Sequence, residues 1–386
     1  MSKPAYFGGK PIREKPLLPA YPLFSKKEFT YISDVLKSHQ IAEGQSTKKL
    51  EERFANFIGT KYCIAVSSGT SALHLALLSL GIKSGDEIIT TPYTFISTSN
   101  ACLYVGAKPV FVDIEPETFN IDSEKIEEKI TNRTRAIIPV HIWGHPCEMK
   151  KIMEIANYNN LSIVEDASHA HGAEYYEKKI GNFGQVNCFS LYATKIITSA
   201  EGGLITTNDK IIADKIRILK RLGEVGRYDH KEIGYNYKIS DIHAAIGLAQ
   251  LEKINKFIRK RRENALYLTK LLSEFKDYIH LPCEKKHIKH AWFYYALLLK
   301  PELLKKISRD LFDKMLRAEN IIPTSYYTKP LHLQDAYNFI GYKKGDFPVA
   351  EGVCERSICL PVHPALGKND MKDIYDAIKK IIHHFI

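Results

Sequence analysis

The chain has 386 residues, of which 45% are hydrophobic and 26% charged, a composition typical of a globular protein large enough for two domains. No stretch approaches the roughly 18–20 consecutive apolar residues of a membrane helix. The polar, proline-rich start MSKPAYFGGKPIREKP is not typical of a signal peptide. The seven cysteines form no CxxC pair, which predicts free thiols in a reducing compartment. We therefore expect a cytoplasmic protein with no membrane partner.

The net charge of +11 would suit a protein that binds nucleic acid or anionic small molecules. The basic clusters KFIRKRREN (256–264) and EKKHIKH (284–290) are interrupted by acidic or apolar residues. No helix-turn-helix, zinc-finger or RNA-binding aromatic signature accompanies them. We therefore interpret the charge as dispersed over exposed helices and expect no nucleic-acid partner.

Short β-rich runs alternate with helical patterns from residue 60 to about 210. We predict strands at 62–66, 86–91, 108–114, 135–140 and 161–166. We predict helices at 70–81, 95–106, 122–131 and 147–160. This alternation predicts an α/β domain with a mostly parallel sheet covered by helices on both faces. Two further strand candidates, 186–192 and 202–207, have no helix between them and would add mixed or antiparallel pairing.

The character of the chain changes after a strongly helical stretch at 240–275, which we predict to be one long helix starting at Ser240. Beyond it we predict strands at 290–300 and 356–362 and helices at 303–319 and 368–384. These elements predict a smaller α+β domain. We place the boundary near residue 255, with a large domain over 1–255, an N-terminal arm over about 1–25, and a small domain over 256–386.

The segment VSSGTSALHLAL (66–77) combines a strand end with a helix start. Ser67, Ser68, Gly69 and Thr70 would expose backbone N–H groups at the helix N-terminus, where anions bind. Neither GxGxxG nor GxxxxGK[ST] is present, so a dinucleotide or P-loop site is not indicated. The same residues would also serve as an ordinary helix cap.

A second segment, LSIVEDASHAHGA (161–173), ends a predicted strand on Asp166. In α/β folds, ligands bind at the carboxyl ends of parallel strands, so Asp166 would hold either a protonated ring nitrogen or a metal. His169 and His171, together with His141 and His145, are conceivable metal ligands. Gly144 and Pro146 keep the latter pair off one helical face, unlike the pair in HExxH, and we expect no metal.

A third segment, SLYATKIITSAEGGLITTND (190–209), places Lys195 among small, apolar and hydroxyl residues. Burying a lysine is costly unless its charge is neutralised or used. Desolvation lowers its pKa, as a lysine that forms a Schiff base requires. Alternatively, the lysine would extend its amine to solvent from a strand end.

An anion site at a helix start, a carboxylate at a strand end and a desolvated lysine are together the parts needed to hold pyridoxal phosphate (PLP). The helix start would bind the phosphate, Asp166 would keep the pyridine nitrogen protonated, and Lys195 would bind the aldehyde. The three segments therefore predict a PLP site.

The sequence resembles the DegT/DnrJ/EryC1/StrS family of PLP-dependent sugar aminotransferases over nearly its whole length. The resemblance implies a fold-type I PLP-dependent transferase. The matching segments are FGGKPIR (7–13), VSSGTSALHLAL (66–77), TPYTFISTSNA (91–101), PVFVDIEPETFNID (109–122), PVHIWGHPCEM (139–149), VEDASHAHGA (164–173), FSLYATKIITSAEGGLITT (189–207), GYNYKISDIHAAIGLAQLEKI (234–254) and GDFPVAEGVCERSICLPVHP (345–364).

The family's roles can be assigned to matching positions around the cofactor ring. Lys195 would be the Schiff-base lysine and the proton shuttle, and Asp166 would pair with the pyridine nitrogen. His169 stands where the family has Gln or His near the ring hydroxyl, and Ser168 where a small residue packs under the ring. Phe95 stands where an aromatic side chain stacks on the other face of the ring.

The phosphate group would be bound by Gly69, Thr70 and Ser190. Asn236, in GYNYK, stands where the family supplies a phosphate contact from the neighbouring subunit. The resemblance therefore implies a homodimer with two shared active sites.

The chain departs from the family pattern at several positions. Ala200 replaces a glycine ahead of Glu-Gly-Gly, and Lys238 replaces an arginine, which keeps the charge but loses a bidentate fork. Tyr326 and Tyr327 stand ahead of KPLH, where the family often has His-Tyr. We expect Lys238, Tyr326, Tyr327 and His332 to face the substrate.

The resemblance implies a ping-pong aminotransferase. Glutamate or glutamine would give its amino group to the cofactor, and a keto-sugar, expected to be nucleotide-linked, would receive it. The basic balance of the chain suits an anionic sugar nucleotide. The sequence alone identifies neither the sugar nor the carbon that is aminated.

Three alternatives stay open at this point. A keto-cyclitol aminotransferase is the nearest, because the GGKPIR opening also occurs in that branch. A PLP-dependent sugar dehydratase of the family would carry histidine in place of Lys195, which argues against it. A cofactor-binding regulatory or nucleic-acid-binding protein would need a DNA-binding module that the sequence does not display.

Overall fold

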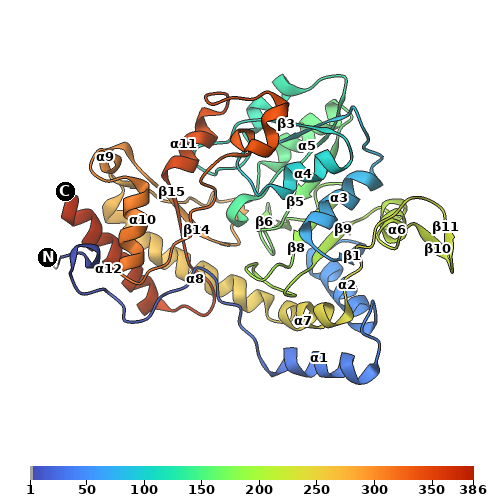
Figure 1. Ribbon diagram of the computed structural model, residues 1–386, viewed down its shortest axis with the longest axis horizontal. Helices are drawn as coiled ribbons and strands as arrows, with labels where there is room; N and C mark the ends of the chain where they lie inside the picture. Colours follow the sequence, from blue (N-terminus) through green and yellow to red (C-terminus); the bar gives the residue numbers. More distant parts are fainter. Residues whose placement is uncertain (1–2) are drawn as a thin grey trace.

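Seven strands form the central sheet of the protein, whose computed structural model describes residues 3–386 (Figure 1). Their spatial order is β1 (Tyr62–Val66), β9 (Gly203–Thr207), β8 (Val186–Ser190), β5 (Ser162–Asp166), β4 (Thr134–Ile137), β2 (Glu87–Thr90) and β3 (Lys108–Phe111). The five strands from β8 to β3 are parallel, and β9 pairs antiparallel with both β1 and β8. The predicted mostly parallel sheet is confirmed, and so is the antiparallel pairing of the strand at 202–207.

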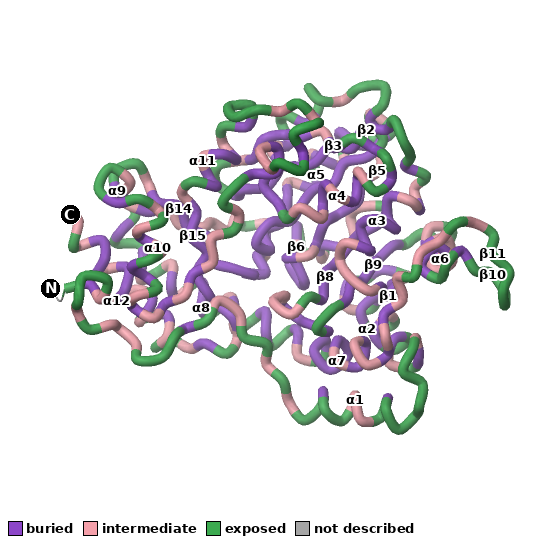
Figure 2. The backbone as a smooth tube through the Cα atoms, in the orientation of Figure 1, coloured by how far each residue is buried: buried purple, intermediate pink, exposed green. Residues whose placement is uncertain are grey.

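Helices cover both faces of this sheet. One face packs on α3 (Gly69–Ser79), α4 (Ser97–Tyr104) and α6 (Lys210–Leu219), and the other on α2 (Gln45–Ile58), α5 (Met149–Tyr158) and α7 (Asp241–Leu251). Along β5, Val164 packs in the core under α3, α4 and α6, and Ile163 packs in the core under α2, α5 and α7, because successive strand side chains point to opposite faces. Both faces are therefore apolar, as the continuous β-rich runs predict. Figure 2 shows these central strands as almost entirely buried.

A second, smaller sheet lies towards the C-terminus. Its order is β12 (Ile279–His280), β14 (Tyr295–Leu299) and β15 (Ser357–Leu360), all antiparallel. A separate apolar core joins it to α8 (Ile254–Leu272), α10 (Arg309–Ala318) and α12 (Lys368–Phe385). At the start of α8, Ile254 is buried in the core of the large sheet, whereas Leu272, at its end, lies in the C-terminal core. This helix therefore bridges the two cores, and a domain boundary near 255 stays a prediction.

The N-terminal segment crosses between these two parts of the molecule. Leu17 is buried in the C-terminal core, where its backbone pairs with Asn320 and Ile322. The chain then runs to α1 (Lys26–Ser38), which lies on the outside of the part of the molecule that contains the large sheet (Figure 1). Ser25 and Glu28 form a capping box that starts this helix.

Three predicted helices differ from the structure. Residues 122–131 form only the short 3-10 turns η2 (Ser123–Lys125) and η3 (Glu127–Lys129), since Ile126 is the main apolar anchor of the segment. The predicted helix at 240–275 is broken between α7 and α8, with no glycine or proline to mark the break. The predicted helix at 303–319 is divided into α9 (Pro301–Leu304) and α10, because Ser308 caps a new helix.

The remaining elements lie at the periphery. We made no prediction for residues 26–58, which form α1 and α2, and none for α6 or α11 (Pro348–Arg356). A small sheet joins β13 (Ile288–Lys289), β6 (Glu174–Tyr175) and β7 (Lys178–Lys179). The hairpin of β10 (Glu224–Gly226) and β11 (Asp229–His230) projects from the body beside α6 (Figure 1). Within residues 3–386, no helix is both long and apolar enough to cross a bilayer.

Candidate active site

A cavity of about 400 Å³ opens at the carboxyl edge of the central sheet. Parallel strands end at one edge, so residues that follow different strands meet there. The lining includes every residue for which the sequence predicts a cofactor role except Asn236. These residues are Gly69, Thr70, Phe95, Asp166, Ser168, His169, Ser190 and Lys195. Of the predicted substrate contacts, Tyr326 and Tyr327 also line the cavity.

The N-terminus of α3 forms one wall of the cavity. Ser68 caps the helix, accepting a hydrogen bond from the Ser71 backbone at 3.0 Å. The next backbone N–H groups, of Gly69 and Thr70, have no acceptor within the helix, so they are available to an anion. A Cβ built on Gly69 would lie 2.9 Å from the Ser190 Cβ, so only glycine leaves room there. This wall therefore has the chemistry of a phosphate site.

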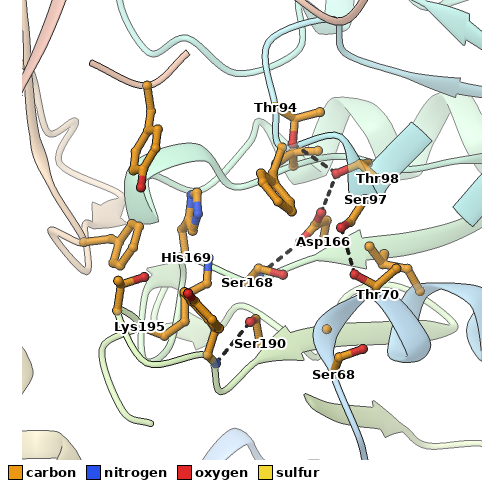
Figure 3. A pocket seen from close by; sticks show the side chains of 18 of the residues that line it. Ser68, Thr70, Thr94, Ser97, Thr98, Asp166, Ser168, His169, Ser190 and Lys195 are labelled. Carbon is orange, nitrogen blue, oxygen red and sulfur yellow. Dashed lines mark hydrogen bonds between the residues drawn. The ribbon is translucent and has the colours of Figure 1, made fainter. Parts of the chain in front are cut away.

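Asp166 ends β5 at the centre of the cavity. The Thr98 hydroxyl donates to its Oδ2 at 2.8 Å, and the Ser168 backbone N–H donates to its Oδ1 at 3.2 Å (Figure 3). Thr94 extends the chain, with its hydroxyl 3.0 Å from that of Thr98. The carboxylate is buried and fixed in orientation, which suits recognition of a protonated ring nitrogen.

Lys195 lies in the turn between β8 and β9 and faces the same space as Asp166 and His169 (Figure 3). Burial lowers the pKa of its amine to about 8, although the charge of Asp166 acts in the opposite direction. Within residues 3–386, no carboxylate forms an ion pair with this amine. Lys195 is half-buried in the cavity wall, and with its lowered pKa the amine can act as a nucleophile near neutral pH.

An aromatic stack forms the wall behind Lys195. The His169 ring stacks on Phe293 at 4.4 Å between centroids and on Trp143 at 5.4 Å. Burial lowers the pKa of His169 well below its ordinary value, and the charge of Lys195 acts in the same direction. No sequence motif indicates a site role for Phe293, Trp143 or Thr98. Trp143 stands inside the predicted segment HIWGHP, but no residue pattern there signals a stacked ring.

Three predicted site residues lie outside this cavity. His332 is buried, with Nε2 2.9 Å from Glu351 Oε1, and the carboxylate also accepts from the Gly345 backbone. Asn236 is exposed and pairs with Arg221, and Lys238 is half-buried nearby. The roles of these three residues stay predictions, including the contact that Asn236 would make to the cofactor phosphate bound in a neighbouring subunit.

His141, from the segment 139–149, is held in a buried hydrogen-bond network. Nε2 of His141 is 3.0 Å from Glu165, and its Nδ1 accepts from the Cys147 backbone. Glu165 in turn accepts from the backbone of the turn at 181–184. In the described part of the chain, no group of three or more His, Cys, Asp or Glu side chains is placed to bind a metal.

Ala200 follows the lysine loop in a left-handed conformation, with φ of 67°. A residue with a Cβ is disfavoured in this region and glycine is not. The family's usual glycine at this position therefore has a backbone reason, and the departure to alanine leaves local strain in the turn.

The sequence model of the DegT/DnrJ/EryC1/StrS aminotransferase family matches residues 22–379. The chain belongs to this family and is an aminotransferase, and the predicted family and fold class are confirmed.

Relatives of known identity support the assignment. The chain is 38% identical to GDP-perosamine synthase of Escherichia coli O157:H7 over 94% of this chain and 98% of that protein. The aminotransferase of Psychrobacter cryohalolentis superposes with a TM-score of 0.91 at 31% identity, covering 96% of this chain and 100% of that one. A Streptococcus pneumoniae protein solved in its PLP form gives a TM-score of 0.91 at 26% identity, with 96% and 100% covered.

Proposed function

We propose that this aminotransferase uses PLP to move an amino group from glutamate or glutamine to a nucleotide-linked keto-sugar. One observation carries the proposal. An anion site at a helix start, a fixed carboxylate and a lysine without an acidic partner line one cavity. The Streptococcus pneumoniae neighbour solved in its PLP form supports the same cofactor.

The residues of the cavity fit this cofactor. Gly69, Thr70 and Ser190 would bind its phosphate, and Asp166 would pair with its pyridine nitrogen. Two features favour an occupant that makes polar contacts: the Lys195 amine has no carboxylate partner, and the buried Nδ1 of His169 has no hydrogen-bond partner among the described residues. Ser168 and the exposed ring of Phe95 would contact the ring faces.

The chain's own residues would then perform the transfer. When bound, PLP supplies a carbon that combines with amines and a ring that takes up electrons. Lys195 Nζ would hold the aldehyde carbon at rest and, once free, would move a proton between the amino-bearing carbon of the donor and that cofactor carbon. A pKa of about 8 allows this amine to act in both directions near neutral pH. Asp166 would keep the pyridine nitrogen protonated, and the aromatic wall would exclude water.

The proposed substrate class is supported by the name of a similar protein and by exposed aromatic residues that line the cavity. GDP-perosamine synthase carries the name of a nucleotide-linked amino sugar. Phe95, Tyr192 and Tyr326 are exposed at the mouth, where aromatic rings can pack against a sugar ring. Lys238, Tyr327 and His332 stay candidate substrate contacts.

We further propose a homodimer that acts in the cytoplasm. Asn236 and Lys238 lie outside the cavity of their own chain, so the contact predicted for Asn236 needs a second copy. All seven cysteines are unpaired, which suits a reducing compartment.

The test is a substrate screen with the purified, PLP-loaded protein and glutamate as donor. The acceptors are a panel of nucleotide keto-sugars and keto-cyclitols. We expect an aminated product from a nucleotide keto-sugar. Product from keto-cyclitols alone would contradict the proposed substrate class. The screen is repeated with glutamine as donor, and the absence of product from every donor and acceptor pair would contradict the transfer.

A further inference from the structure

The Lys195 amine lies over an aromatic ring and forms no ion pair with an acid among the described residues. Its Nζ lies 5.0 Å from the centroid of the Phe293 ring, within the range of a cation–π contact. Phe293 is buried, and its ring also contacts the stacked His169 ring and the ring of Tyr294. The free amine therefore has the face of the Phe293 ring within cation–π range.

The position of Phe293 is fixed by its backbone. Its N–H donates to the Trp143 carbonyl at 2.8 Å, and the neighbouring Ala291 N–H donates to the Gly144 carbonyl at 2.9 Å. Gly144 has a φ of 91°, and a Cβ there would lie 2.8 Å from the His169 carbonyl oxygen. The turn at 143–144 therefore holds both rings of the stack, His169 and Phe293, in one arrangement.

Arg261 on α8 holds the same segment from behind. Its guanidinium is buried and donates to the carbonyls of Trp292 and Phe293 at 3.2 and 2.9 Å. Among the described residues it forms no ion pair, and its Nε has no hydrogen-bond partner. A buried guanidinium is costly, and one without an acidic partner needs a role beyond a salt bridge. Arg261 and Lys195 also line one small cavity.

We propose that the face of Phe293, held in place by Arg261, receives the Lys195 amine whenever that amine is not bound covalently. Phe293 is then a positioning residue for amino transfer, acting through Lys195. This inference rests on the proposed function, in which Lys195 alternates between a bound and a free state.

The chemistry of the surroundings explains why a ring suits this position. A carboxylate partner would hold the ammonium strongly and keep it protonated, whereas a ring face attracts it more weakly. The charged and titratable groups around the amine are Asp166, His169, His171, Glu201 and Arg261. Of these, Asp166 favours the ammonium, and the charge of Lys195 in turn disfavours protonation of His169 and His171. Phe293 therefore steadies the amine without trapping it.

The experiment measures the protonation of free Lys195 in the full chain loaded with pyridoxamine phosphate. Acetic anhydride acylates the neutral amine, and peptide mass spectrometry reports the extent at Lys195 as a function of pH. Phe293 is replaced by phenylalanines with increasing ring fluorination, which keeps the shape but weakens the cation–π attraction. We expect the midpoint to fall stepwise, by between about 0.5 and about 1 pH unit over the series. Phe293→Leu is expected to lower it as well.

Matched controls separate this effect from general packing. Phe312, buried in the C-terminal core, receives the same fluorinated side chains and the leucine substitution, with no expected change at Lys195. In Arg261→Lys the fluorination series is expected to shift the midpoint less, because the ring is held less firmly; an equal shift would overturn the part assigned to Arg261. A midpoint unchanged across the Phe293 series would overturn the proposal.

The two proposals fail in different ways. Added pyridoxamine phosphate leaves Lys195 free whether or not any amino donor reacts. An unchanged midpoint with normal amino transfer would contradict only the role of Phe293. A normal fluorination effect with no transfer from any donor would contradict only the proposed function.

Discussion

The Thr98 hydroxyl donates a 2.8 Å hydrogen bond to Oδ2 of Asp166, joining the first turn of α4 to the end of β5. Both side chains are buried. This contact to Oδ2, together with the Ser168 backbone N–H that donates to Oδ1, fixes the orientation of the carboxylate in the cavity. Thr98 is therefore a positioning residue for Asp166.

Replacing Thr98 with valine tests this relationship. The substitution keeps the shape of the side chain and removes the donor, and a hydrogen bond to a charged group contributes about 1.5–3 kcal/mol. We expect the affinity for PLP to fall by about tenfold or more. Thr98→Ser keeps the hydroxyl and should retain most of the affinity. Equal affinity for Thr98→Val and the unchanged chain, measured by fluorescence titration, would contradict the role.

Gly69→Ala tests the anion site at the start of α3. The new Cβ would lie 2.9 Å from Ser190 Cβ, so the wall must shift where the phosphate is expected. We expect weaker binding of both PLP and inorganic phosphate, measured by calorimetry. Gly352→Ala on α11 is the matched control, because its Cβ would meet nothing nearer than the Arg356 guanidinium at 3.4 Å. Unchanged phosphate binding in Gly69→Ala would place the anion elsewhere.

The pKa of Lys195 predicts a pH dependence for cofactor capture. Burial lowers this pKa from 10.5 to about 8, and only the neutral amine reacts with an aldehyde. As pH rises through the lowered pKa, the neutral fraction increases. The rate at which the unloaded chain captures PLP should therefore rise and level off above about pH 8. Lys195→Ala corrects for other lysines, and a rate still rising towards pH 10.5 would show an unperturbed amine.

Ala200→Gly is expected to stabilise the chain. Ala200 has a φ of 67°, a conformation that costs a residue with a Cβ about 1–2 kcal/mol. Glycine removes this strain but gains freedom in the unfolded state, so we expect a net gain of about 0.5–1 kcal/mol. Urea unfolding measures the difference. The control Ala318→Gly, in α10, should destabilise, and a lower midpoint for Ala200→Gly would contradict the strain.

The parts of the site that could be predicted are those carried by local sequence. Asp166 and Ser190 each end a β-rich run, and the Ser-Gly-Thr turn starts a strongly apolar helix. Such patterns survive folding because strand and helix periodicity is set by neighbouring residues.

The parts that could not be predicted depend on contacts between distant segments. Phe293 reaches the cavity only because its backbone pairs with the turn at 143–144. In the sequence, nothing distinguishes Thr98 from the other small residues of its helix, and its contact with Asp166 exists only because the fold brings β5 beside α4. His332, predicted to face the substrate, contacts the Glu351 carboxylate, and no local sequence pattern indicates that contact.

The proposed reaction is amino transfer through a cofactor held at Lys195. It is tested most directly by a single turnover of the PLP-loaded protein with ¹⁵N-glutamate, followed by a nucleotide keto-sugar after the free donor is removed. We expect stoichiometric 2-oxoglutarate in the first step and ¹⁵N in the sugar after the second, with both lost in Lys195→Ala. Unlabelled sugar, or equal transfer by Lys195→Ala, would contradict it.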